Sequence, residues 1–79
     1  MLAAFVEGMI DGFNRGVEVG RLDVSATRVM IGYLSAASIG LRCNGMDQEA
    51  QAFLEAASAI ESDWTCYERA IRELAERYR

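Results

Sequence analysis

The chain has 79 residues, 52% of them hydrophobic and 25% charged, with a net charge of −4 at pH 7. This composition indicates one small globular domain and excludes disordered, collagen-like and low-complexity chains. The sequence contains no histidine. Because histidine is the commonest general base and the commonest metal ligand, most catalytic and metal-binding arrangements are excluded as well.

The first predicted element is an amphipathic helix over residues 2–20, with Glu7, Asp11 and Glu18 on its polar side. Glycines stand at every fourth position of this helix: Gly8, Gly12, Gly16 and Gly20. Each internal glycine costs about 0.5–1 kcal/mol relative to alanine, so this row predicts a surface that a neighbouring backbone approaches closely. Gly20 is also expected to end the helix.

The second predicted helix covers residues 26–43, with Ser25 as its N-cap and the Asn44-Gly45 pair at its end. A broad apolar arc predicts that it is the most buried helix. It has its own row of small residues at four-residue spacing: Gly32, Ala36 and Gly40. The two rows facing each other predict a closely packed αα-hairpin of the first and second helices.

The third predicted element is one long helix over residues 47–79. Its large hydrophobic residues follow an unbroken spacing of alternately four and three residues: Met46, Ala50, Phe53, Ala57, Ile60, Trp64, Tyr67, Ile71, Leu74 and Tyr78. The alternative is a break near Ser62-Asp63, where Ser62 could cap a fourth helix. We expect the continuous helix, because a turn would normally shift the phase of the repeat.

A continuous third helix predicts a homodimer. At ~1.5 Å per residue it would be about 50 Å long, whereas the first two helices reach only ~27 Å. The uncovered part would expose an apolar stripe that a second copy of the chain could cover, formed by Trp64, Tyr67, Ile71, Leu74 and Tyr78. If the helix breaks near Ser62, four helices close into a bundle and this argument for a dimer no longer applies.

Acidic residues are concentrated in residues 46–63, which contain no basic residue. We expect an acidic face that binds a protein partner with a basic surface, formed by Glu49, Glu55, Glu61 and Asp63. The alternative is that Arg28 and Arg42 of the second helix pair with these acids at the surface, where such pairs contribute little.

The sequence shows no nucleophile beside a base, no phosphate-binding loop and no metal-ligand cluster, so we expect no enzyme activity, no cofactor and no metal. Cys43 and Cys66 are too few for a disulfide framework and are expected to be buried, reduced thiols, with a disulfide as the alternative. The longest uncharged run, Val29 to Leu41, is shorter than the ~20 residues of a membrane span. A soluble, cytoplasmic protein is therefore expected.

The hypothesis that remains is a small acidic interaction module that regulates or inhibits a larger macromolecule by occupying its binding site. Compact acidic proteins with which phages and other mobile elements block host machinery have this physical profile. The alternative is a helical DNA-binding transcriptional regulator, because residues 19–29 have some features of the turn in a helix-turn-helix. The excess of acidic over basic residues argues against nucleic acid as a partner.

Overall fold

The structure, a computed structural model, describes residues 1–18 and 24–79. These residues form α1 (Leu2–Glu18), α2 (Val24–Cys43), α3 (Asp47–Ser62), the 3-10 helix η1 (Trp64–Cys66) and α4 (Tyr67–Tyr78), with no strand among them. The predicted all-α class is confirmed. Gly20, the expected end of the first helix, lies outside the described residues. Ser25 is not the N-cap of the second helix, because α2 already includes Val24.

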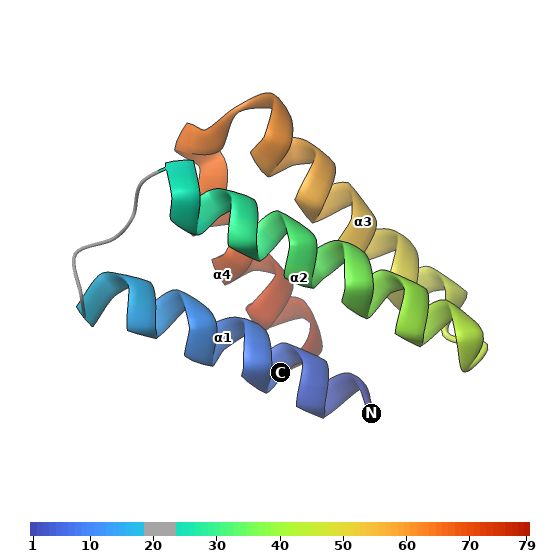
Figure 1. Ribbon diagram of the computed structural model, residues 1–79. Helices are drawn as coiled ribbons and strands as arrows, with labels where there is room; N and C mark the ends of the chain where they lie inside the picture. Colours follow the sequence, from blue (N-terminus) through green and yellow to red (C-terminus); the bar gives the residue numbers. More distant parts are fainter. Residues whose placement is uncertain (19–23) are drawn as a thin grey trace.

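The helices enclose one hydrophobic core. Helices α2 and α3 run antiparallel, side by side (Figure 1). Helix α1 has fewer contacts with α2, and α4 lies behind the space between α1 and α2, where it packs against α1 and α3 (Figure 1). The largest fully buried side chains come from α1, α2 and α3: Val6, Met9, Leu34, Leu41, Phe53 and Ile60. The aromatic rings of α4 complete this core, since Tyr67 packs edge-on against Phe13 of α1 with ring centroids 5.2 Å apart.

The turn between α2 and α3 follows the predicted helix end. Gly45 has a φ of +77°, in the left-handed region that glycine adopts without strain. Its amide donates to the carbonyl of Arg42 at 3.1 Å, and the amide of Met46 donates to the carbonyl of Leu41 at 3.0 Å. These two bonds form a Schellman motif, which satisfies the last carbonyls of α2 and reverses the chain into α3.

The expectation of one continuous helix over residues 47–79 is wrong, and the alternative of a break near Ser62 is what the structure shows. Asp63 is extended, with φ −149° and ψ 93°. Its carboxylate accepts hydrogen bonds from the amide of Thr65 at 3.1 Å and from the hydroxyl of Thr65 at 2.6 Å. Asp63 therefore caps the turn η1, and a short polar segment interrupts the helix although the hydrophobic spacing continues through it.

The expectation that the five residues of the dimer stripe are exposed is also wrong. Tyr67, Ile71 and Leu74 are buried inside the chain, because the break folds α4 back onto the core. Tyr78 is half-buried and lies beside the ring of Phe53 at 6.3 Å. Of the five proposed interface residues only Trp64 is exposed, so the stripe cannot hold two copies together.

The closest helix packing joins α2 to α3 and not, as the glycine rows predicted, α1 to α2. The hydroxyl of Ser38, buried on α2, donates to the backbone carbonyl of Ala50 on α3 at 2.8 Å. Ala50 is fully buried, and Ala57 one heptad later is buried as well. Alanines of α3, rather than glycines of α1, thus bring a backbone close to α2.

Candidate interaction surfaces

Gly8 of α1 and Gly40 of α2 each receive an aromatic side chain rather than a facing backbone. The hydroxyl of Tyr33 on α2 lies where a Cβ of Gly8 would stand and donates to the carbonyl of Phe5 at 2.9 Å. In return, the ring of Phe5 reaches to 3.0 Å from the position of a Cβ on Gly40. Each helix therefore places an aromatic ring over a glycine of the other, and the rings hold the two backbones apart.

A groove of about 340 Å³ remains between α1 and α2. We call it the glycine groove. It is lined by glycines of α1, by side chains of α2 and by one tyrosine of α4, with one arginine at its rim: Gly8, Gly12, Gly16, Ser25, Ala26, Val29, Met30, Tyr33, Tyr67 and Arg15. Burial raises the pKa of Tyr33 and of Tyr67, so both phenols are protonated at neutral pH. The lining is thus uncharged except at the rim, where Arg15 pairs with Asp11 at 3.2 Å.

The outward face of α2 forms a second uncharged surface, which we call the α2 stripe. Its exposed residues recur at helical spacing along the whole helix: Ser25, Val29, Gly32, Ala36, Ile39 and Cys43. Val29 is 74% exposed and Ile39 is 67% exposed. The sequence led us to expect α2 to be the most buried helix, but one side of it faces solvent with apolar side chains.

The structure does not bring the four predicted acids into one acidic face. Glu49, Glu55 and Glu61 are six residues apart on α3, which places them about 120° from one another around the helix axis. Asp63 lies beyond the end of the helix, where its bonds to Thr65 lower the pKa of its carboxyl and keep it ionised. These residues point in different directions and cannot meet one partner surface together.

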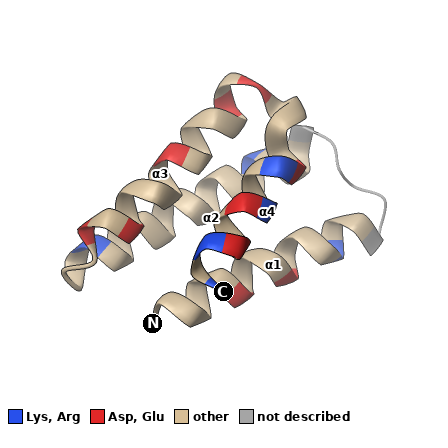
Figure 2. Ribbon diagram, turned by 180° about the vertical axis from the view of Figure 1, so that it is seen from behind, with Lys and Arg blue, Asp and Glu red and all other residues tan. Residues whose placement is uncertain are grey.

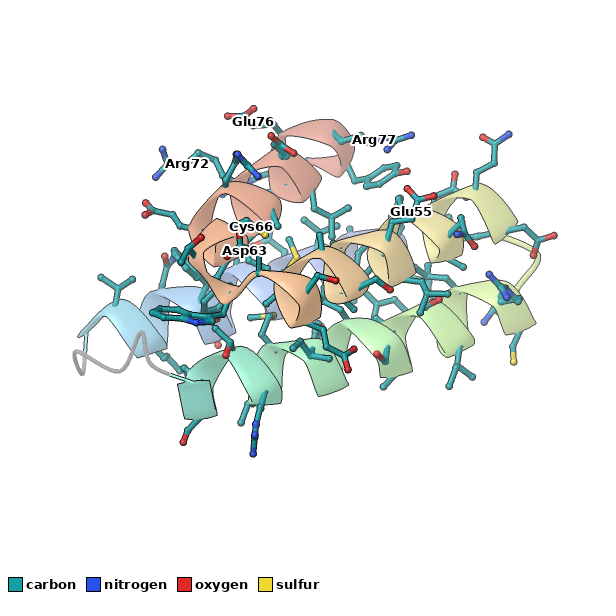
Figure 3. The ribbon with its side chains drawn as sticks, turned by 90° about the horizontal axis from the view of Figure 1, so that it is seen from above. Glu55, Asp63, Cys66, Arg72, Glu76 and Arg77 are labelled. Atoms are coloured by element: carbon teal, nitrogen blue, oxygen red, sulfur yellow. The ribbon has the colours of Figure 1, made fainter. Side chains whose placement is uncertain are left out.

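Of these acids, Glu55 is the one that lines a hollow between helices. It lies on α3 opposite Arg77 of α4 (Figure 3), in a depression of about 220 Å³ that is lined mainly by alanines. The side-chain amide of Gln51 donates to Glu55 at 3.4 Å, and a guanidinium nitrogen of Arg42 donates to Gln51 at 3.4 Å. Arg42 therefore reaches α3 through a glutamine, and no ion pair joins α2 to α3 in the part of the chain that the structure describes.

Charge is distributed unevenly over the molecule. Acidic residues lie along α1, α3 and α4, whereas α1 and α4 also carry basic residues and α3 carries none (Figure 2). On α4 the exposed Arg72 and Glu68, 2.6 Å apart, neutralise one another. The 20 residues of α2 include only Arg28 and Arg42 as charged residues. The uncharged surfaces therefore gather on the side of the molecule formed by α2 and the glycine groove.

The cysteines differ from expectation in one respect. Cys66 is buried as predicted, but Cys43 is exposed at the end of the α2 stripe. Within residues 1–18 and 24–79 there is no group of three or more cysteine, aspartate or glutamate side chains placed to hold a metal ion. The helices of these residues include none with the length and apolar character of a membrane span.

Compared with known proteins, the chain matches no family model, no curated protein and no solved structure.

Sequence reasoning missed the α2 stripe, although a signal was present. The uncharged run from Val29 to Leu41 is too long for a helix that has one solvated polar face. The helical period places Arg28, Ser35, Ser38 and Arg42 on one narrow polar side of the helix, but Ser38 is buried against Ala50. The buried serine turns the helix so that small and apolar residues face outward.

Proposed function

We propose that this protein is a small non-enzymatic interaction module that regulates or inhibits a larger macromolecule by occupying one of its binding sites. The observation that supports the proposal is the side of the molecule formed by α2 and the glycine groove, where apolar side chains are left in solvent. Such surfaces on a small domain are typical of protein contacts. The partner is a protein, and its contact is an apolar side chain that enters the glycine groove.

A protein partner suits the glycine groove better than a small molecule does. Sites for small ligands combine an apolar cavity with several convergent polar groups that fix the ligand's orientation. In this groove the hydroxyl of Tyr33 is already bound to the carbonyl of Phe5, and Arg15 at the rim is paired with Asp11. Ser25 and Tyr67 also line the groove with hydroxyl groups, but most of what it offers is shape and apolar surface, which a partner's side chain can use.

The test compares two arginine variants of α1. A Cβ at Gly12 has only the Met30 methyl near it, at 3.7 Å, so we expect Gly12→Arg to fold with its side chain in the groove. Ala3 is exposed and lies about 180° around α1 from Gly12, so Ala3→Arg adds the same charge away from the groove. We expect the tagged Ala3→Arg protein to retain a partner captured from its native host and the Gly12→Arg protein to lose it. Equal capture by both variants would refute the groove as the contact.

A further inference from the structure

The turn between α3 and α4 is held by one carboxylate. In a continuous helix the amide of Thr65 would donate to the carbonyl of Glu61, four residues earlier. It donates instead to the carboxylate of Asp63 at 3.1 Å, and the hydroxyl of Thr65 donates to the same oxygen at 2.6 Å. Every residue from Glu61 to Thr65 is exposed, so no core side chain fixes this stretch. The turn therefore depends on the Asp63 cap and on the packing of α4 that follows it.

The hydrophobic spacing across the turn is also compatible with one continuous helix. Ile60, Trp64 and Tyr67 keep the separations of four and three residues that precede and follow them. In a single helix over residues 47–78, the buried side chains of α3 and α4 would lie along one side: Phe53, Ala57, Ile60, Tyr67, Ile71 and Leu74. The chain thus allows two backbone conformations at this point, and the cap favours the turn.

A single chain cannot adopt the continuous helix and keep its core. Tyr67, Ile71 and Leu74 are buried in the closed chain, where α4 packs against α1 and α3. Straightening the helix would carry these side chains into water and uncover the surfaces of α1 and α3 beneath them. A second copy that has opened in the same way exposes the matching surfaces, because its α1 and α3 are identical.

We infer that the Asp63 cap selects between the closed chain and a dimer in which two copies exchange α4. In the exchanged dimer each α4 makes with α1 and α3 of the other copy the contacts that it makes within the closed chain, such as the edge-on packing of Tyr67 on Phe13. Only the turn differs, since residues 63–66 become helical. In the closed chain these side chains are buried and join nothing, so exchange requires the turn to open first.

The exchange changes how many glycine grooves one particle presents. Tyr67 lines the glycine groove of the closed chain. In the exchanged dimer, Tyr67 of each copy would complete the groove of the other, and one particle would carry two grooves. The inference goes beyond the proposed function and does not depend on it, because the mass of the particle is measured without any partner.

The first measurement removes the cap. Asp63→Ala/Thr65→Ala deletes both side chains of the cap and replaces them with the best helix former. Each dimer opens two turns, so we expect the dimer dissociation constant to fall at least about tenfold relative to Asp63→Asn/Thr65→Ser, which retains an acceptor and a hydroxyl. Both variants are refolded from urea at the same high concentration, and sedimentation compares their masses with the 8.7 kDa of one chain.

A further substitution should close the turn again. Proline disrupts the interior of a helix but is favoured at the first position after a cap. The extended backbone of Asp63 also suits the residue before a proline. Adding Trp64→Pro to Asp63→Ala/Thr65→Ala should therefore return the mass to that of one chain.

The second measurement tests whether α4 is exchanged. Glu55 and Arg77 are exposed and line one depression between α3 and α4 (Figure 3), whereas in a continuous helix they would stand about 33 Å apart. In a Cys43→Ser background, Glu55→Cys/Arg77→Cys is treated with a short bismaleimide cross-linker. The link should lie within one chain when the cap is intact, and it should join two chains under denaturing conditions in the Asp63→Ala/Thr65→Ala protein.

Four results would each overturn the inference. The first is an Asp63→Ala/Thr65→Ala protein that stays monomeric up to millimolar concentration, and the second is one that loses its helical circular dichroism, since the cap would then support the whole fold. The third is a dimer that Trp64→Pro leaves intact. The fourth is a dimer whose cross-links fall within each chain. Loss of partner capture in Gly12→Arg bears on the glycine groove alone, so failure of the groove and failure of the exchange are distinguishable.

Discussion

Helix α2 meets its two neighbours in different ways. Against α3 it packs closely through alanines and a buried serine hydroxyl that donates to the backbone carbonyl of Ala50. Against α1 it is held by two aromatic rings that each cover a glycine, and a groove remains beside them. Small residues therefore have opposite effects in the two contacts. Alanine lets backbones approach, whereas glycine makes room for a large side chain from the neighbouring helix.

The largest expected effect comes from enlarging a residue in the close contact. Ala50→Leu inserts a branched side chain where Ser38 touches the α3 backbone, and overpacking of this kind costs about 1–3 kcal/mol. For a domain of this size, each kcal/mol lowers the melting temperature by about 4–8 °C. The exposed substitution Ser58→Leu on the same helix should change the free energy of unfolding by less than about 0.5 kcal/mol. Similar melting temperatures for the two variants would mean that α2 and α3 are not closely packed.

An intermediate effect is expected at Gly8, in the contact between α1 and α2. The Cβ of Gly8→Ala would displace the Tyr33 hydroxyl from the Phe5 carbonyl, and the lost hydrogen bond and overpacking should cost about 1–3 kcal/mol. This loss exceeds the gain of about 0.5–1 kcal/mol from helix propensity, so the free energy of unfolding should fall. Once the Tyr33 hydroxyl has been removed, Gly8→Ala should no longer lower the free energy of unfolding. In a Tyr33→Phe background, Gly8→Ala should be neutral or stabilising, as urea unfolding of the double-mutant cycle can show. Additive effects would mean that Gly8 and Tyr33 do not interact.

The smallest change in the free energy of unfolding is expected at Gly12, and there the substitution should stabilise the protein. A Cβ there lies in ordinary contact with the Met30 methyl at 3.7 Å, so Gly12→Ala should retain the fold and gain about 0.5–1 kcal/mol from helix propensity. The melting temperatures of Gly12→Ala and Gly8→Ala, measured under the same conditions, test this difference. If Gly12→Ala destabilises the protein as much as Gly8→Ala does, the whole glycine row of α1 packs against α2 and the groove is filled in solution.

Sequence reasoning went furthest where a local signal controls the backbone. The helical periods predicted the helices, and Asn44-Gly45 predicted the turn after α2, because a positive φ at that position favours glycine. It failed at Asp63, where the 4-3 spacing continues across the break. Two amphipathic helices in sequence can keep that spacing by coincidence, and the cap that separates them is a single side-chain interaction with Thr65.

The sequence by itself determined that the chain is helical, that it contains no histidine and that the α2 segment bears little charge, since composition and period are properties of the chain. Only the tertiary structure decided which side of α2 is buried. That choice depends on the Ser38 hydroxyl reaching a carbonyl of α3 and the Tyr33 hydroxyl reaching a carbonyl of α1. Both partners are backbone atoms of other helices, and periodicity within α2 holds no information about where those atoms lie.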